Sequence, residues 1–316
     1  MPLSQPTQNI LEPKRERKIL KCSECNIIRS TLDEIHQICY VCYKTKTLFK
    51  SSGNKVIDDF IRHTQINYCG NVGWKMEFVP YDQFEDIEFI AEGGFSKIYK
   101  ATWIDGPINN WRSIINNTYD VFRKHNYTIV LKKLNNSKNV TSKELNELKI
   151  FYQVFSKGGG SLRISNYFGI TQDPITKDIM IIMPYYNSGD LIHYIGKDFY
   201  NFSWERKLGK IWRIIIGLVK IHELGIIHRD LHSGNIFVNS GDGVNHVVIE
   251  IFQGRKYTMA SDIYSFGMIM WEFMTGRRPF WNEIHDIELI IEICDGLRPP
   301  IVTNAPEGYI ELMKEC

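Results

Sequence analysis

The run from His228 to Asn235 constrains this chain more than any other part of its sequence. It reads His-Arg-Asp-Leu-His-Ser-Gly-Asn, so an aspartate and an asparagine share one short segment. A positioned aspartate can accept the proton of a hydroxyl group, and an asparagine oxygen can coordinate a magnesium ion. Because both side chains would face the same point from one short loop, we expect Asp230 and Asn235 to belong to a single reactive site.

A turn containing two glycines lies upstream of this run. Its flanking residues, 86–90 and 97–102, predict a β-hairpin with residues 91–96, Ala-Glu-Gly-Gly-Phe-Ser, at its tip. Glycine lets backbone amides approach a bound phosphate because it has no Cβ atom. A glycine turn is common in ordinary hairpins, and a lysine is common on a surface strand. Their order here, with Lys132 on the next predicted strand, 127–134, favours a phosphate-binding site.

The rest of the chain divides into a strand-rich part and a helical part. An apolar strand is predicted at 179–183, just before Pro184. The pattern of apolar residues predicts helices at 56–61, 141–155, 204–224 and 261–274. Strands followed by helices indicate an α+β fold with two lobes, a β-rich lobe at 81–185 and a helical lobe at 186–316.

Residues from about 86 to 315 resemble the protein-kinase domain, in particular the tyrosine-kinase-like branch of the serine/threonine kinases. The chain is also similar to an expanded fungal family whose members carry a short paired Cys-x-x-Cys segment before the kinase domain. The stretches that carry this similarity are 52–55, 103–107, 134–137 and 260–267. The resemblance implies a two-lobed kinase-like fold and ATP-dependent phosphorylation of protein serine or threonine in intracellular signalling, with tyrosine left open as an acceptor.

The same resemblance implies roles for individual polar residues. Asp230 would accept the proton of the substrate hydroxyl, Asn235 would hold one magnesium ion, and Lys132 would meet the phosphates of ATP and a helix glutamate. Glu147 is our choice for that glutamate, and Glu144, one turn away on the same face, is the alternative. The residues expected around ATP are Ala91, Gly93, Gly94, Ser96, Ile98, Val130, Lys132, Met183, Tyr185 and Phe237.

One further carboxylate has an implied structural role. Asp262 should sit at the buried start of the 261–274 helix and hold the backbone of the 228–235 loop. Residues 183–186, Met-Pro-Tyr-Tyr, correspond to the hinge between the lobes. Since Pro184 has no N–H group, neighbouring backbone groups would bind the adenine.

Four positions around the expected nucleotide depart from the kinase pattern. Ala91 and Ser96 replace the first and third glycines of the loop, Val130 replaces an alanine above the adenine, and Phe237 is larger than the usual leucine below it. The larger side chains would narrow the adenine slot unless the surroundings repack. We therefore expect binding of ATP and magnesium to be weak or lost.

The activation segment is the largest departure. A kinase has Asp-Phe-Gly after the position of Asn235 and Ala-Pro-Glu before the position of Asp262, and neither tripeptide occurs between Asn235 and Asp262 in this sequence. The predicted strand 247–249 runs directly into Glu250, which resembles the residue that follows Ala-Pro. Asp242, in the turn 240–243, lies on the wrong side of the strand to replace the magnesium aspartate. Because a magnesium ligand and the peptide platform are missing, catalysis should be impaired.

Three explanations fit this pattern. The chain is a pseudokinase that keeps the fold for binding, or a truncated gene product joined at 249–250, or an active kinase of unusual form. The last helix of the lobe is also expected to be missing after Cys316, together with the arginine that would pair with Glu250. A buried, unpaired Glu250 would make the protein unstable.

Four of the seven cysteines form two Cys-x-x-Cys pairs, Cys22 with Cys25 and Cys39 with Cys42. Two such turns at this separation fit a zinc ribbon with four thiolate ligands. Free thiols are the alternative, and His36 is an alternative for one ligand. The other cysteines lack a partner at suitable spacing and are expected to be free: Cys69, Cys294 and Cys316.

Charge and composition indicate an intracellular protein. Lysine and arginine total 38 against 36 aspartates and glutamates, so the chain has no general attraction for nucleic acid or membrane. No N-terminal apolar segment resembles a signal peptide. We expect a cytoplasmic protein whose partners are protein substrates or signalling proteins. Before the lobes, the expected segments are a disordered tail at 1–20, a zinc-ribbon-like segment at 21–44 and a linker with a short helix at 45–80.

Overall fold

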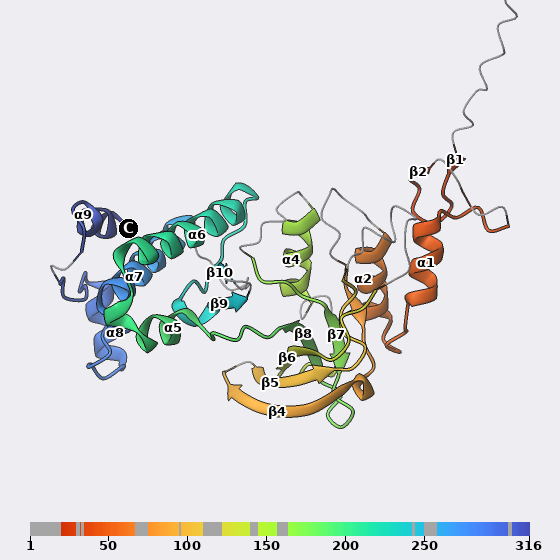
Figure 1. The fold of residues 1–316 in the computed structure, drawn as a ribbon, viewed down its shortest axis with the longest axis horizontal. Helices are drawn as coiled ribbons and strands as arrows, with labels where there is room; N and C mark the ends of the chain where they lie inside the picture. Colours follow the sequence, from red (N-terminus) through yellow and green to blue (C-terminus); the bar gives the residue numbers. More distant parts are fainter. Residues whose placement is uncertain are drawn as a thin grey trace, which may run out of the picture.

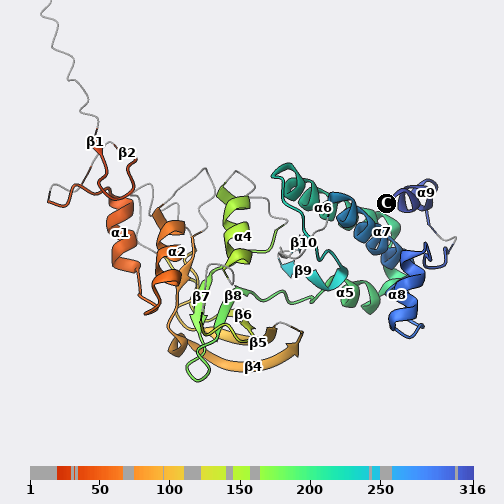
Figure 2. The same cartoon turned by 180° about the vertical axis from the view of Figure 1, so that it is seen from behind.

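The computed structural model describes most of the chain and confirms an α+β fold with two lobes. The described residues are 20–29, 32, 35–66, 75–94, 96–109, 122–139, 145–156, 164–241, 244–249, 258–302 and 305–316. Apart from its last residue, the tail expected at 1–20 lies outside these ranges. Figures 1 and 2 show the β-rich lobe and the helical lobe side by side, joined by an extended segment after β8.

The β-rich lobe is built on a six-stranded sheet with the order β3-β7-β8-β6-β5-β4. Its strands are β3 (Glu77–Phe78), β4 (Phe84–Glu92), β5 (Ser96–Trp103), β6 (Tyr127–Leu134), β7 (Gly169–Gln172) and β8 (Ile179–Pro184). All neighbours are antiparallel except β3 and β7. The predicted hairpin is confirmed as β4–β5, and the predicted strands at 127–134 and 179–183 are confirmed as β6 and β8.

Helices cover the β-rich lobe on one side (Figure 1). The helix α2 (Lys55–Ile66) is twice as long as the helix predicted at 56–61. Its continuation beyond Ile61 is held by buried polar residues, Thr64 and Gln65, and Gln65 donates to the carbonyl of Met76. The helix α4 (Asn146–Ser156) corresponds to the predicted 141–155, whose first four residues lie outside the described residues. The remaining elements before β4 are β1 (Leu20–Lys21), β2 (Ile28–Arg29), α1 (Tyr40–Leu48) and the 3₁₀ turn η1 (Tyr81–Gln83).

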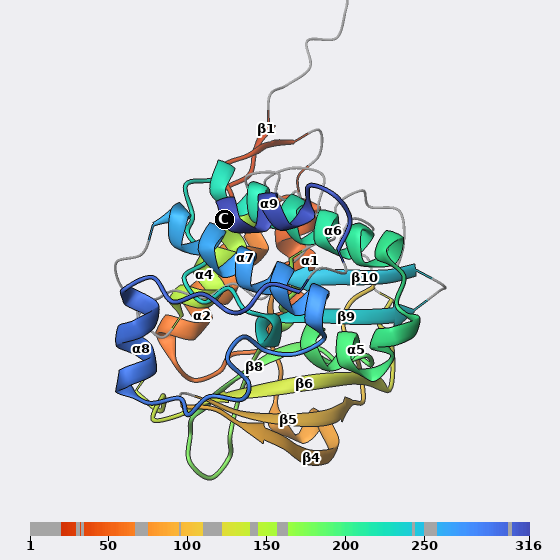
Figure 3. The same cartoon turned by 90° about the vertical axis from the view of Figure 1, so that its left-hand side faces the viewer.

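The second lobe is helical around one β-hairpin. Two of its helices match predictions: α6 (Trp204–Glu223) and α7 (Met259–Thr275), whose apolar residues pack into one core. The other elements are α5 (Leu191–Lys197), η2 (Phe199–Asn201), η3 (Ser233–Asn235), β9 (Ile236–Gly241), β10 (Val244–Ile249), α8 (Ile287–Cys294) and α9 (Tyr309–Glu315). Figure 3 views this lobe from its outer side, with β9 and β10 beneath α6 and α7. Among the described residues, no helix is both long enough and apolar enough to cross a bilayer.

Backbone contacts tie the two lobes together beside the hairpin. Ser165 of the β-rich lobe donates its N–H to the carbonyl of Ile249 at 2.9 Å, and within the helical lobe Val238 donates to the carbonyl of Gly189 at 3.0 Å. Both Ile249 and Val238 are fully buried. The hairpin that follows the 228–235 loop is therefore fixed at the junction of the lobes.

Candidate active site

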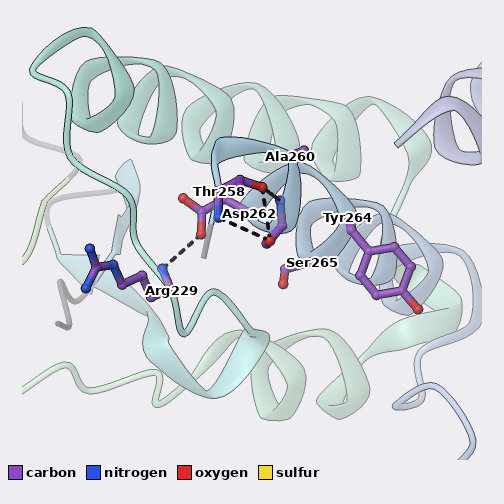
Figure 4. A pocket seen from close by; sticks show the side chains of 7 residues that line it. Arg229, Thr258, Ala260, Asp262, Tyr264 and Ser265 are labelled. Carbon is purple, nitrogen blue, oxygen red and sulfur yellow. Dashed lines mark hydrogen bonds between the residues drawn. The ribbon is translucent and has the colours of Figure 1, made fainter. Parts of the chain in front are cut away.

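The 228–235 loop is anchored by one buried carboxylate. Asp262, in the first turn of α7, accepts the backbone N–H of His228 at 2.8 Å and that of Arg229 at 2.9 Å. His222 of α6 lies 2.8 Å from the same carboxylate. Arg229 has a φ of 72°, a strained value for a residue with a side chain, and the bond to Asp262 holds it there. Figure 4 shows this bond, and the predicted position of Asp262 is confirmed.

Asp230 and Asn235 meet as the sequence predicts. The amide nitrogen of Asn235 donates to the backbone oxygen of Asp230 at 2.8 Å and to its carboxylate at 2.9 Å. A hydrogen bond from His232 and the bond from Asn235 lower the pKa of Asp230. Asp230 is therefore ionised at neutral pH, and its side chain is 55% exposed. An ionised, accessible carboxylate is what a proton acceptor for a hydroxyl group requires.

Lys132 lies at the centre of the sheet. It is buried on β6, between Ile98 of β5 and Ile181 of β8. Glu147 belongs to α4, but its side chain lies outside the described residues, and so does the whole of Glu144. The ion pair between Lys132 and a helix glutamate therefore stays a prediction.

The glycine turn leaves space for a ligand. Gly93 donates its N–H to the carbonyl of Ser96 at 2.8 Å, which closes the turn between β4 and β5. Among the described residues, which omit Phe95, a Cβ atom added at Gly93 would meet only the Ser96 oxygen, at 3.9 Å, and one added at Gly94 would meet nothing within 4 Å. The described packing thus does not require these glycines, whereas the close approach of a phosphate would.

The hinge contains a contact that the sequence did not reveal. Tyr186 stacks on Phe237, with ring centroids 5.3 Å apart and an angle of 14° between the planes, and its hydroxyl lies 3.0 Å from that of Ser165. Phe237 therefore packs against the hinge, while Met183 is buried and Tyr185 is partly exposed beside it. Two consecutive tyrosines after Met-Pro were the only available signal for this stack.

A pocket of about 560 Å³ opens below the anchored loop (Figure 4). Its lining consists of Arg229, Thr258, Ala260, Ser261, Asp262, Tyr264 and Ser265. Thr258 and Ser261 cap the N-terminus of α7 reciprocally. None of the residues expected around ATP lines this pocket, so it is separate from the nucleotide site. Asp242 and Glu250 lie outside the described residues.

The four predicted cysteine ligands come together at the other end of the chain. Their sulfur atoms all lie within 4.8 Å of one another, with Cys22 and Cys42 at 3.8 Å and Cys25 and Cys39 at 3.9 Å. Zn–S bonds of about 2.3 Å in a tetrahedron place sulfur atoms about 3.8 Å apart, so the cluster fits zinc. His36 is not part of it. Burial opposes ionisation of Cys22, but backbone N–H donors outweigh burial and lower its pKa to about 7.

Comparison with known proteins identifies relatives of both lobes. The sequence model of the protein tyrosine and serine/threonine kinase family matches residues 84–249 and 242–316. The chain is 30% identical over 169 residues to ephrin type-A receptor 7 of Gallus gallus, covering 44% of this chain and 17% of that protein. It is 26% identical over 283 residues to probable serine/threonine-protein kinase pats1 of Dictyostelium discoideum, covering 75% of this chain and 8% of that protein. The chain thus spans less than a fifth of either relative.

Proposed function

The chain belongs to the protein tyrosine and serine/threonine kinase family, and we propose that it is a protein kinase of the serine/threonine type whose phosphoryl transfer is impaired. The anchored loop carries this proposal, because it presents Asp230 beside Asn235 while the sequence offers no Asp-Phe-Gly. Asp230 would accept the proton of a substrate hydroxyl, and Lys132 would hold the nucleotide phosphates. Magnesium, when bound at Asn235, would supply charge stabilisation for the transferred phosphoryl group.

The two-part family match supports a missing activation segment. The matched parts, 84–249 and 242–316, overlap over residues 242–249, just before Glu250. The structure describes Ile249 as the last residue of a buried strand and Thr258 as the cap of α7, while residues 250–257 lie outside the described residues. A segment lost between them would remove the magnesium aspartate without removing Asp230 or Asn235.

Turnover of Mg-ATP with a generic protein substrate tests the proposal directly. We expect a slow transfer that Asp230→Asn abolishes, because an amide cannot accept the hydroxyl proton. Inserting an Asp-Phe-Gly to Ala-Pro segment from a close relative between Ile249 and Glu250 should raise the rate. A chimera that folds and binds ATP but transfers no phosphate would contradict this account.

A non-catalytic binding protein is the second candidate. The absence of Asp-Phe-Gly favours it, since a domain that cannot hold magnesium can still bind a signalling protein through its surface. Absence of any transfer that depends on Asp230, together with a stable fold, would favour this pseudokinase function. Sequencing of the transcript across Ile249–Glu250 would identify a truncated gene product instead.

We also propose that the four-cysteine cluster holds a structural zinc ion. The support is the packing of four thiols at tetrahedral spacing, with Cys22, Cys39 and Cys42 buried. Elemental analysis of the purified protein should give one zinc per chain. Cys42→Ser should lose it, while replacement of the exposed Cys294 should not.

A further inference from the structure

The helix α2 shares a hydrophobic core with α4, the helix that carries Glu147. Ile57, Phe60 and Ile61 of α2 belong to the same buried cluster as residues of α4. The members from α4 are Leu148, Phe151 and Val154. Figures 1 and 2 show the two helices next to each other on the same side of the sheet. A shift of α2 would therefore change the packing that holds α4.

A direct contact and a shared sheet extend this core to the nucleotide site. The ring of His63 on α2 meets the ring of Tyr152 on α4 edge to face, with centroids 5.4 Å apart. The cluster also contains Ile181 and Met183 of β8, and Ile181 is the strand partner of Lys132. The core that packs α4 against β8 therefore reaches the strand partner of Lys132.

The segment that carries the four cysteines, residues 21–44, is here called the cysteine element, and a carboxylate within it binds to α2. Glu24, inside the first Cys-x-x-Cys turn, pairs with Lys46 of α1 at 2.8 Å and with Arg62 of α2. Its side chain is mostly buried, so these pairs are less screened than ordinary surface pairs. Cys42 itself lies on α1. The four thiols, α1 and α2 are therefore connected through Glu24.

We propose that α2 positions α4 for the nucleotide site, and that the cysteine element controls this position through the contact of Glu24 with Arg62. This inference rests on the proposed kinase function. Metal in the cluster fixes the first Cys-x-x-Cys turn, the turn fixes Glu24, and Glu24 fixes α2 against α4. Arg62 acts here as a positioning residue, since it touches none of the residues expected around ATP.

Hydrogen exchange of the full chain tests the inference without requiring ATP. Backbone amides of α4, 146–156, are compared between zinc-loaded protein and protein treated with a chelator, with α6 as the internal reference. Zinc should slow exchange in α4 by at least about fivefold, the lower end of ordinary coupling between sites, and leave α6 unchanged. Arg62→Ala should raise exchange in α4 similarly in zinc-loaded protein, and Arg62→Lys should restore most of the protection.

Lys55→Ala is the matched control. Lys55 also lies on α2 and also forms an ion pair, but its partner is Asp59 of the same helix and both side chains are exposed to solvent. Its replacement should leave exchange in α4 unchanged. Unchanged α4 exchange in a folded Arg62→Ala protein would overturn the inference, even if chelation unfolds the whole chain. Because exchange is measured without nucleotide, the inference can hold when phosphoryl transfer is absent, and it can fail when transfer is present.

Discussion

Replacing Glu272 with glutamine should stabilise the protein at neutral and alkaline pH and change little in acid. Glu272 lies on α7 with 5% of its surface exposed, and within the described part of the chain its Oε2 atom has no hydrogen-bond partner. Burial raises the pKa of its carboxyl group to about 7. A hydrogen bond with Ser233 and the charges of Arg278 and His232 oppose this rise, whereas the charge of Asp190 adds to it.

The pH dependence follows from the direction of the shift. Below pH 4.5 the carboxyl group is protonated in both the folded and the unfolded protein. As the pH rises from 4.5 to about 7, the unfolded chain loses this proton first, so the free energy of unfolding falls and then levels off. The rise in pKa corresponds to about 3 kcal/mol. Glutamine cannot ionise, so the Glu272→Gln variant should keep that stability, worth roughly 6–12 °C in melting temperature.

Thermal unfolding of both proteins across this pH range measures the effect. The melting temperatures should agree near pH 4.5 and diverge as the pH rises, with the variant higher. Glu223→Gln, at an exposed position on α6, should give no such divergence. A difference in melting temperature that is constant with pH would show that folding does not raise the pKa of Glu272. A variant that melts lower above pH 7 would show that the surroundings stabilise the charge of Glu272. Either result would refute the reasoning.

The nucleotide site, the anchored loop and the cysteine element each carry one further prediction. ATP should bind with a dissociation constant above roughly 100 μM and with little dependence on magnesium; calorimetry that finds much tighter, magnesium-dependent binding would contradict this. Asp262→Ala should cost about 3–6 kcal/mol in urea unfolding, because two backbone N–H groups lose a charged acceptor; a loss below about 1 kcal/mol would show that the loop holds itself. The Cys42→Ser variant should melt at a lower temperature than the unmutated protein when both are supplied with zinc, and at the same temperature when zinc is withheld from both.

Local patterns in the sequence were sufficient to place most elements and the reactive loop. The hairpin β4–β5, the strand β6 and the helices α6 and α7 follow from periodicity, which depends on neighbouring residues alone. Asp230 and Asn235 meet because their spacing is fixed within one turn. Tyr186 and Phe237 are distant in sequence and meet only through the fold, so their stack was not predicted, while the place of Phe237 beneath the adenine stays a prediction. The role of α2 was missed for the same reason, since its partners come from α4 and β8.

The anchored loop explains how a site can keep its form when a neighbouring segment is missing. Within the described residues, Asp262 of α7, which His222 of α6 also contacts, holds His228 and Arg229, and Asn235 of the loop holds Asp230. The near side of the junction is held from the other lobe, because Ile249 accepts a hydrogen bond from the backbone N–H of Ser165. Loss of the segment between Ile249 and Glu250 would therefore remove a magnesium ligand without releasing the proton acceptor. This independence is the reason to expect that an inserted segment would find Asp230 already in position.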